Sequence, residues 1–264
     1  MSTERPLTAL PLRSAFLGLA GLALGLFVLV GCDSAGTSSE GGEVAVGFGT
    51  VAPSTASARA FAKADDSLTV DGANGTLTIT DIRFIVSEVE MEGEADSAEF
   101  ETEEPAFVDL PLNSTDVVSV VSGQIPPGTY NEFGFEVEDA DLDDEEEDEI
   151  SRLRANIEDA GFPDWPGAAS MVVVGTFTPD GGDARMFTTY FDAEIEVEIE
   201  MDGRSFVVGG DDPSRQLTVN LSPSRWFVSD GQPLDLSSDA YQNREEPVEF
   251  EVEFEEESEI EFDD

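Results

Sequence analysis

The sequence predicts an all-β protein, an antiparallel β-sandwich of about ten strands with one short helix. Three observations support this prediction. From Val44 onward, apolar residues recur at every second position, as they do in half-buried strands. Glycine-containing turns, such as residues 180–183, separate these segments. Only residues 149–160 place apolar side chains clearly at helical spacing, and Gly161 follows where a helix would end.

The amino-terminal segment predicts export. Two arginines precede an apolar run of 16 residues, Ala15 to Val30, which is shorter than the roughly 20 residues of a membrane-spanning helix. The run ends in Leu29-Val30-Gly31-Cys32, and Cys32 is the only cysteine. This motif resembles a bacterial lipobox, which implies cleavage between Gly31 and Cys32 and attachment of a diacylglyceryl group to Cys32, with palmitate-like acyl chains. An uncleaved single-span anchor is the alternative.

These features predict three segments: a lipoprotein signal peptide at 1–31, a lipidated cysteine with a flexible tether at 32–43, and a single β-sandwich domain at 44–264. Two or more acyl chains attach a protein stably to a membrane. We therefore expect a lipid-anchored protein of the cell envelope. Asp33 resembles an inner-membrane retention signal, but that rule varies between phyla and leaves the leaflet open.

The composition of the predicted mature chain limits the classes of partner and of active site that it can have. Removing 31 of 264 residues leaves 233, with 58 acidic and 10 basic side chains and a formal charge of −48. Such a charge repels nucleic acid, so we expect no nucleic-acid partner. The chain contains no histidine, which excludes Ser-His-Asp and Cys-His nucleophile systems and histidine metal ligands.

The acidity is spread along the whole chain, and Lys63 is the only lysine. This balance resembles that of halophilic proteins. The Debye length falls to about 3 Å at 1 M salt, so carboxylates that repel one another in dilute buffer become hydrated, solubilising groups. We therefore expect adaptation to high salt.

The first long strand region of the domain contains two irregularities. A hairpin turn is predicted at residues 71–75, and the strand after it continues to Met91. Its apolar phase slips twice, so we expect β-bulges near Asp81 and Ser87 that keep the apolar side chains on one face. Farther along, residues 114–121 predict a short capped helix before a strand at 133–137.

Val108-Asp109-Leu110 is followed, after a spacer, by Ile125-Pro126-Pro127-Gly128-Thr129-Tyr130 and a strand. This arrangement resembles a family of bacterial cell-envelope lipoproteins built on a domain of unknown function, a prealbumin-like β-sandwich. The likeness covers Val44 to Val137. It implies a sandwich fold in the envelope and carries no catalytic residues to this chain.

In the second half of the domain, apolar and acidic residues alternate along the sequence. Residues 193–201 place apolar side chains against glutamates without a break, which predicts a strand with one core face and one carboxylate ladder. Asp202-Gly203 predicts a hairpin turn after it. Residues 171–177 predict a strand buried on both faces. Further strands are expected at 206–208, 217–221, 226–228 (with Trp226 in the core) and 248–254, and a helical turn at 234–241.

The acidic run Glu138 to Glu149 is a candidate Ca²⁺ site, with Asp139, Asp141, Asp143 and Asp144 as ligands, because hard cations take several carboxylate oxygens. An EF-hand loop that starts at Asp139 does not match the motif, because Asp144 occupies the position where glycine is needed. A solvated run of charge is the alternative interpretation.

Trp165 lies in a loop between two prolines, where an exposed indole would stack on a sugar ring or a partner surface. The alternative is a loop anchored by burial of its aromatic side chain. No motif indicates catalysis, so we expect a non-catalytic envelope lipoprotein that binds a protein or glycan partner or has a structural role. A Ca²⁺-dependent module and a carboxylate-pair hydrolase are the alternatives.

Overall fold

The structure is a computed structural model that describes residues 41–51, 67–93, 98–113, 115–140, 142, 148–201, 205–209, 214–242, 244, 246–250 and 258–262. The chain divides into two compact units, Met1–Thr37 and Ser38–Asp264, and every described residue belongs to the second. The predicted signal peptide and Cys32 therefore lie outside the described residues.

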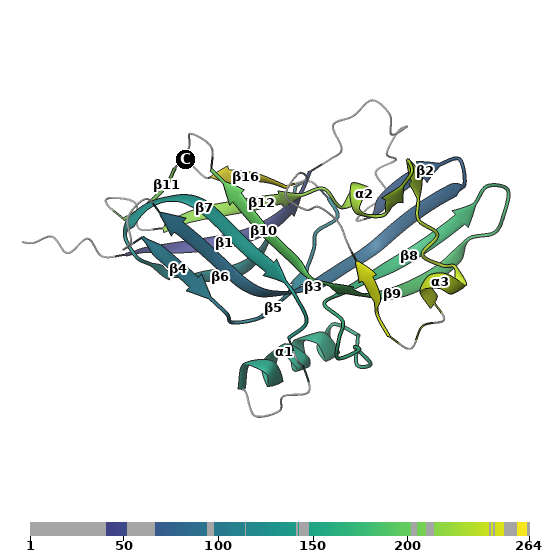
Figure 1. The fold of residues 1–264 in the computed structure, drawn as a ribbon, viewed down its shortest axis with the longest axis horizontal. Coiled ribbons are helices and arrows are strands. Elements are labelled where there is room, and N and C mark those ends of the chain that lie inside the picture. The colour runs from purple at the N-terminus through teal and green to yellow at the C-terminus, as the bar shows by residue number, and fades with distance from the viewer. Residues whose placement is uncertain are drawn as a thin grey trace, which may run out of the picture. The chain divides into compact units, whose positions relative to one another are not determined.

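The second unit is all-β, as predicted, with short helices (Figure 1). Its strands are β1 (Gly42–Thr50), β2 (Leu68–Gly72), β3 (Gly75–Gly93), β4 (Glu99–Thr102), β5 (Ala106–Asp109), β6 (Val118–Ile125), β7 (Gly128–Val137), β8 (Met171–Pro179), β9 (Arg185–Ala193), β10 (Ile195–Glu200), β11 (Phe206–Val208), β12 (Ser214–Leu221), β13 (Val228–Ser229), β14 (Gln232–Pro233), β15 (Val248–Phe250) and β16 (Ser258–Phe262). Its helices are α1 (Asp148–Asp159), α2 (Pro223–Trp226) and α3 (Asp239–Gln242).

Two sheets form the sandwich. The small sheet has the order β16-β12-β1-β6, and the large sheet has the order β10-β7-β3-β8-β9-β15, with β2, β4, β5 and β11 joined to it at β3 or β7. Most pairs are antiparallel, but β1 pairs with β12 and β9 pairs with β15 in parallel. The prediction of an antiparallel sandwich is thus correct for most of the fold and misses two pairings between segments distant in the sequence.

Strand β3 confirms both predicted bulges. Its register against β8 shifts between Ile79 and Asp81, and its register against β7 shifts between Val86 and Glu88. Because of these shifts, its apolar residues other than Ile85 reach the same core in spite of the change of phase. They are Leu77, Ile79, Ile82, Phe84, Val86, Val89 and Met91.

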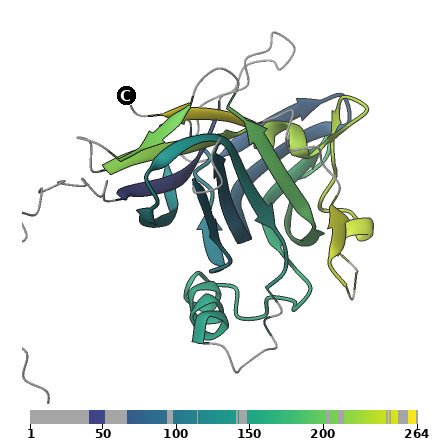
Figure 2. The same ribbon diagram turned by 60° about the vertical axis from the view of Figure 1, so that its left-hand side comes forward.

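The large sheet contains strands that lie end to end. β7 and β8 follow one another along the same edge of β3, and β9 and β10 follow one another along their other side. Ser170 fills the junction: it is fully buried, its amide donates to the Phe191 carbonyl, and its Oγ accepts from the Ala193 amide at 2.6 Å. The chain thus leaves the sheet after Val137 and returns to it at Met171, and Figure 2 shows α1 outside the sheet.

The hairpin predicted at Asp202-Gly203 is wrong. β10 and β11 both pair antiparallel with β7, with Glu200 opposite Glu132 and Phe206 opposite Tyr130, so the chain continues in one direction along the same edge. A turn dipeptide between two strands usually predicts a hairpin. The same dipeptide can also occur where a single strand is interrupted and then continues in the same direction. The two turn residues themselves lie outside the described part of the chain.

The core lies between the two sheets. Phe48 of the small sheet contacts Phe84 and Phe135 of the large sheet, with ring centroids 5.9 and 4.9 Å apart. Tyr130 is fully buried in the same core cluster, and its hydroxyl donates to the Pro126 carbonyl at 2.8 Å. A tyrosine bonded to the backbone four residues upstream fixes the entry of β7 into the core, as tyrosine corners do in other sandwiches.

Helix α1 confirms the clearest helical prediction. Gly161 has φ +99°, its amide donates to the Glu158 carbonyl, and the Phe162 amide donates to the Ile157 carbonyl. These bonds form a Schellman motif that ends the helix. The apolar side of α1 packs on Ile85, which points outward from β3, together with Leu142, Phe107, Phe162 and Trp165.

Four local predictions differ from the structure. From Val118 onward, the segment predicted as a capped helix is part of strand β6, because Val118 and Val121 pair with β1. Trp226 is buried as predicted, but it ends helix α2 instead of starting a strand. β1 begins at Gly42, inside the predicted tether, because Gly42 and Glu43 pair with β6. The helical turn predicted at 234–241 is confirmed only at α3.

Candidate functional site

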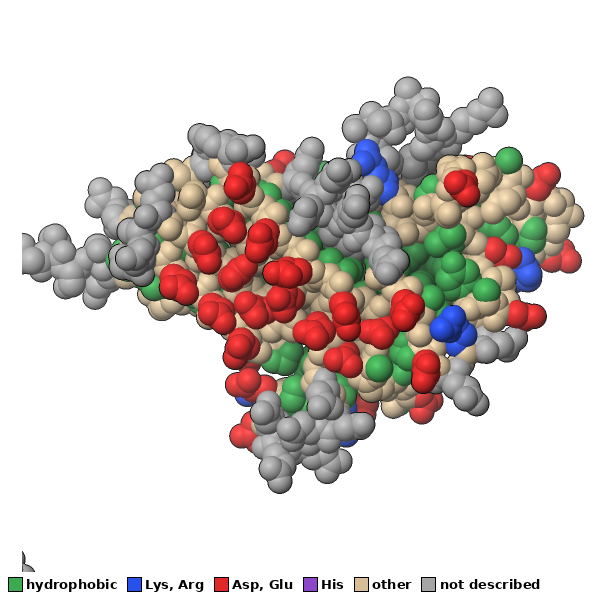
Figure 3. All heavy atoms as spheres, viewed as in Figure 1, with side chains coloured by type: hydrophobic (Ala, Val, Ile, Leu, Met, Phe, Trp, Pro, Cys, Tyr) green, Lys and Arg blue, Asp and Glu red, His purple; other side chains and the backbone are tan. Residues whose placement is uncertain are grey.

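The strand segments β4, β3, β7 and β10 present a surface that we call the acidic face. Its side chains alternate with core residues along each strand, so they point away from the small sheet. Figure 3 shows them as a dense group of carboxylates on the left of the view. The acidic face consists of Glu88, Glu90, Glu92, Glu99, Glu101, Glu103, Glu132, Glu136, Glu196, Glu198 and Glu200.

The sheet register places these glutamates in rows. Glu136 lies opposite Glu88 on one side and Glu196 on the other. In the middle row, Gly134 lies opposite Glu90, and a Cβ on Gly134 would lie 2.6 Å from Glu90 Cγ, so the glycine leaves space that Glu90 fills. Like charges directly opposite one another destabilise a sheet. The third row contains Glu99, Glu92, Glu132 and Glu200.

Crowding of carboxylates changes their proton affinity. Partial burial, and then the charges of neighbouring glutamates, raise the pKa of Glu88, Glu90, Glu132 and Glu136 above the usual value. Both causes disfavour the ionised form. The acidic face is therefore electrostatically costly in dilute buffer, and salt reduces that cost by screening.

Within the described residues, Glu88, Glu101 and Glu103 bring one carboxylate oxygen each within 4.8 Å of one another. Oxygen ligands of this kind suit Ca²⁺ or Mg²⁺. Glu101 and Glu103 are exposed, however, and a cluster of exposed carboxylates is the ordinary surface of a chain this acidic. The cluster by itself identifies no metal centre.

The predicted Ca²⁺ ligands are separate from this cluster. Asp139 is half-buried just after β7, and Asp141, Asp143 and Asp144 lie outside the described residues. The structure therefore does not bring the four aspartates together or separate them, and the Ca²⁺ site stays a prediction. The same holds for Gly31 and Cys32.

Trp165 is held rigidly in its loop. Its Nε1 donates to the Ala169 carbonyl at 2.7 Å, and its ring contacts Phe107 and Tyr190 edge-on with centroids 5.5 Å apart. Phe162 makes a third edge-on contact at 6.1 Å. The loop is thus anchored by its tryptophan, as the alternative interpretation expected, yet the indole remains partly exposed.

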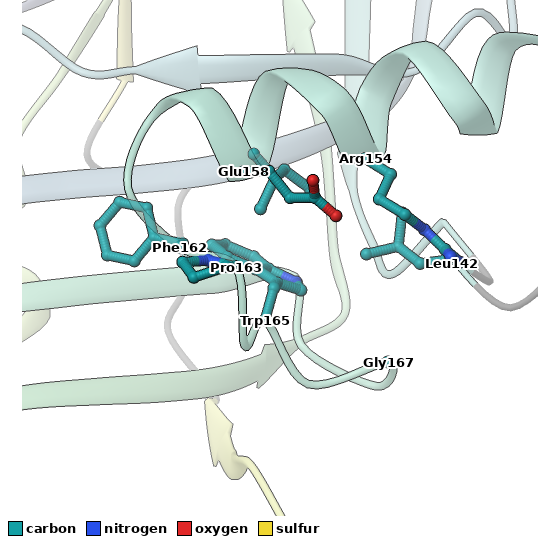
Figure 4. Close-up of a pocket in the computed structure, with 8 residues that line it drawn as sticks. Leu142, Arg154, Glu158, Phe162, Pro163, Trp165 and Gly167 are labelled. Carbon is teal, nitrogen blue, oxygen red and sulfur yellow. The ribbon is translucent and has the colours of Figure 1, made fainter.

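The exposed part of Trp165 lines a pocket of about 210 Å³, which we call the α1–Trp165 pocket. Figure 4 shows Glu158 extending from α1 over the side of the pocket where Trp165 lies, whereas the Arg154 side chain lies beside Leu142. The pocket is lined by Leu142, Arg154, Ile157, Glu158, Phe162, Pro163, Trp165 and Gly167.

A second pocket of about 330 Å³ bears on the hydrolase alternative, because Asp81, Asp109 and Asp116 line it. Arg83 lies 2.9 Å from an Asp81 oxygen and 3.3 Å from an Asp109 oxygen, and its guanidinium lies 5.3 Å from the Phe162 ring centre. Burial, against the opposing charge of Arg83, raises the pKa of Asp109. Arg83 is mostly buried and requires such partners, so a structural ion-pair network accounts for Asp81 and Asp109. Asp116 accepts a hydrogen bond from Asn113 Nδ2 at 2.8 Å.

The sequence pointed to Trp165 but not to the charged side chains that line its pocket. Arg154 and Glu158 are four residues apart on the predicted helix, so they share one face of it, and Gly161 turns the chain back beneath that face. The helical spacing was visible in the sequence. The position of the loop under the helix depends on the Schellman motif and on the contacts of Trp165.

Comparison with known proteins gives no match to a protein-family model, to a curated protein or to a solved structure. None of the described helices is long and apolar enough to cross a membrane.

Proposed function

We propose that this chain is a non-catalytic, lipid-anchored lipoprotein of the cell envelope, whose β-sandwich acts as a binding or structural module in a salt-rich medium. The observation that carries the proposal is the Leu29-Val30-Gly31-Cys32 lipobox, which ends an apolar run and contains the only cysteine. The cell-envelope family that residues 44–137 resemble supports the same location.

The number of residues between Cys32 and the first strand supports this role. The first strand begins at Gly42, ten positions after Cys32. Ten residues rich in glycine and serine span roughly 20 Å on average, which lifts a domain clear of lipid head groups. The sandwich would then present its outer faces to the aqueous phase for binding.

The anchor is tested by mass spectrometry of the protein purified from membranes. We expect an amino-terminal peptide that begins at Cys32 and carries a diacylglyceryl group. The Cys32→Ala variant is the control, and we expect it to retain its leader. A wild-type amino terminus at Met1, without lipid, would contradict the anchor. Co-purification at the native salt concentration, with the Cys32→Ala variant alongside, then identifies partners that depend on membrane attachment.

The acidic face supports the adaptation to high salt. Because glutamates lie opposite glutamates on neighbouring strands, we expect a higher melting temperature in about 2 M NaCl than in dilute buffer. A triple variant with glutamine at positions 90, 132 and 136 removes three of these charges and is expected to depend less on salt. Equal melting temperatures of the wild type in both buffers would refute this part of the proposal.

Calcium separates the main proposal from its alternative. A Ca²⁺-dependent module that uses Asp139, Asp141, Asp143 and Asp144 would melt at a higher temperature in millimolar Ca²⁺. We expect no shift in high-salt buffer. A shift that is lost when the four aspartates are replaced by asparagine would favour the alternative.

A further inference from the structure

We propose that the α1–Trp165 pocket binds one ring of a neutral saccharide. This inference deepens the binding role proposed above and rests on it, since it assigns that role a ligand class and a place on the domain. The pocket lies on the outer side of the large sheet and shares no lining residue with the acidic face or with the pocket beside Arg83.

The size of the pocket sets the scale of the ligand. Its volume of about 210 Å³ is below the range of about 300–1,000 Å³ that accommodates drug-sized molecules. It therefore suits a single ring. Glu158, Pro163 and Gly167 at its margin are exposed, so the remaining rings of an oligosaccharide can extend into solvent.

One side of the pocket is aromatic and rigid. Trp165 is fixed by the hydrogen bond from its Nε1 to Ala169 and by edge-on contacts with three rings. A fixed indole loses little conformational entropy when a ligand packs on it. The C–H groups of a sugar ring match such a surface, because an aromatic face carries partial negative charge.

The other side of the pocket offers hydrogen bonds of both kinds. Arg154 supplies donors and Glu158 supplies acceptors, and both side chains line the pocket opposite Trp165 (Figure 4). Within the described residues the Glu158 carboxylate makes no hydrogen bond or ion pair, so it is available to accept from a ligand. Hydroxyl groups both donate and accept, which suits this mixed pair.

The charge balance favours a neutral ligand. The whole chain carries a formal charge of −47, which repels anions. Among the described residues that line the pocket, Arg154 and Glu158 carry one charge of each sign, so this pair does not select an ion of either sign. A saccharide without ionised groups satisfies both residues and the aromatic side.

The test uses the complete lipidated protein in a detergent without a sugar head group, in high-salt buffer. Trp226 is only 3% exposed, and the Trp226→Phe background leaves Trp165 as the single tryptophan. We expect maltotriose, cellotriose or chitotriose to produce a saturable change in its fluorescence, and calorimetry on the wild type to give the same dissociation constant.

Matched variants locate the site. Arg154→Ala and Glu158→Gln should each weaken binding about tenfold or more, since each removes a hydrogen bond to a charged group. Arg152→Ala and Asp159→Asn are the controls, because they make the same changes on the exposed part of α1 outside the pocket. They should change binding less than about twofold.

Two outcomes would overturn the inference: no response to any of the three saccharides at millimolar concentration, or binding that the pocket variants and the control variants weaken equally. Circular dichroism of each variant shows whether α1 is retained. The anchoring proposal is judged separately by the amino-terminal mass, so a protein that is lipidated but binds no saccharide loses only the ligand assignment.

Discussion

The outer face of the large sheet is completed in two different ways. Where β3 passes Ile85, α1 and the Trp165 loop cover it and bury a small apolar cluster. Three residues later, beyond the bulge at Ser87, β3 presents Glu88, and the acidic face begins. The same strand thus supplies a buried contact and a charged surface, and the inner face beneath both is continuous core.

This difference shows where stability originates. The acidic face adds repulsion and little apolar burial on its own side, so the core beneath it must hold these strands together. The α1 cluster adds burial of its own, but it involves few residues. Substitutions in the two regions should therefore differ in size and in their dependence on salt.

The largest effect is expected beneath the acidic face. Phe135 is 1% exposed and contacts Phe48 of the opposite sheet, so Phe135→Ala should lower the free energy of unfolding by about 3–5 kcal/mol. Denaturant unfolding in high-salt buffer measures this. Met186→Ala is the control, because Met186 is 86% exposed, and a change of similar size there would refute the assignment of the core.

A smaller loss is expected in the α1 cluster. Leu153→Ala removes a side chain that is 1% exposed and should cost about 2–3 kcal/mol. Because the cluster also includes Trp165, tryptophan fluorescence should report the change. Asn156→Ala on the exposed side of α1 should change the unfolding free energy by less than about 0.5 kcal/mol. Equal effects at both positions would mean that α1 does not pack on the sheet.

The entry of β7 into the core gives a third comparison. Tyr130→Phe keeps the ring but leaves the Pro126 carbonyl without its donor, so we expect a loss of about 1 kcal/mol. Tyr241→Phe removes a hydroxyl that makes no hydrogen bond within the described residues and serves as the control. Unfolding curves that show equal losses for both variants would argue against the tyrosine corner.

The smallest effect concerns pH. The pKa values of Glu88, Glu90, Glu132 and Glu136 are raised in the fold, so the folded state binds protons more readily than the unfolded state. The stabilisation that comes from this tighter proton binding is fully present below the pKa of the unfolded state, near 4.5. It is lost as the pH rises through the pKa of the folded state. Acidification from about pH 7 to about pH 5 in dilute buffer should therefore raise the melting temperature slightly.

Glu90→Gln imitates protonation at the middle of the acidic face. We expect this variant to melt at a slightly higher temperature than the wild type at neutral pH and to respond less to acidification. Glu43→Gln, at an exposed position on β1 outside the acidic face, is the control. If the melting temperature of the wild type decreased on acidification from about pH 7 to about pH 5, this would contradict the raised pKa values.

Particular residues show how far the sequence could be used for prediction. The slips of apolar phase near Asp81 and Ser87 predicted both bulges, because side chains on a strand alternate with a strict period of two. The valines at 117–121 were assigned to a helix, since cap-like residues precede them. From Val118 onward they form a strand because this segment pairs with β1. Val118 lies opposite Phe48, 70 residues earlier, and the local sequence does not indicate a partner at that distance.

For the candidate sites too, some features were visible in the sequence and others depended on the fold. The carboxylate ladder of residues 195–200 was evident from alternation, whereas its union with the glutamates of β3, β4 and β7 depended on the order of the strands. Trp165 was evident as an unusual loop residue. Its pocket required α1 to lie above the loop, which the Schellman motif at Gly161 and the contacts of Phe107 and Tyr190 bring about.

The sequence by itself determined the all-β class, helix α1 with its end at Gly161, the bulges of β3 and the alternation of glutamates with core residues. These features follow from periodicity and turn chemistry, which act between near neighbours in the chain. The tertiary structure alone decided the parallel pairs, the end-to-end arrangement of β7 with β8, the continuous acidic face and the α1–Trp165 pocket. These depend on contacts between distant segments, whose free energy is shared over the whole core and leaves no mark on any one stretch of sequence.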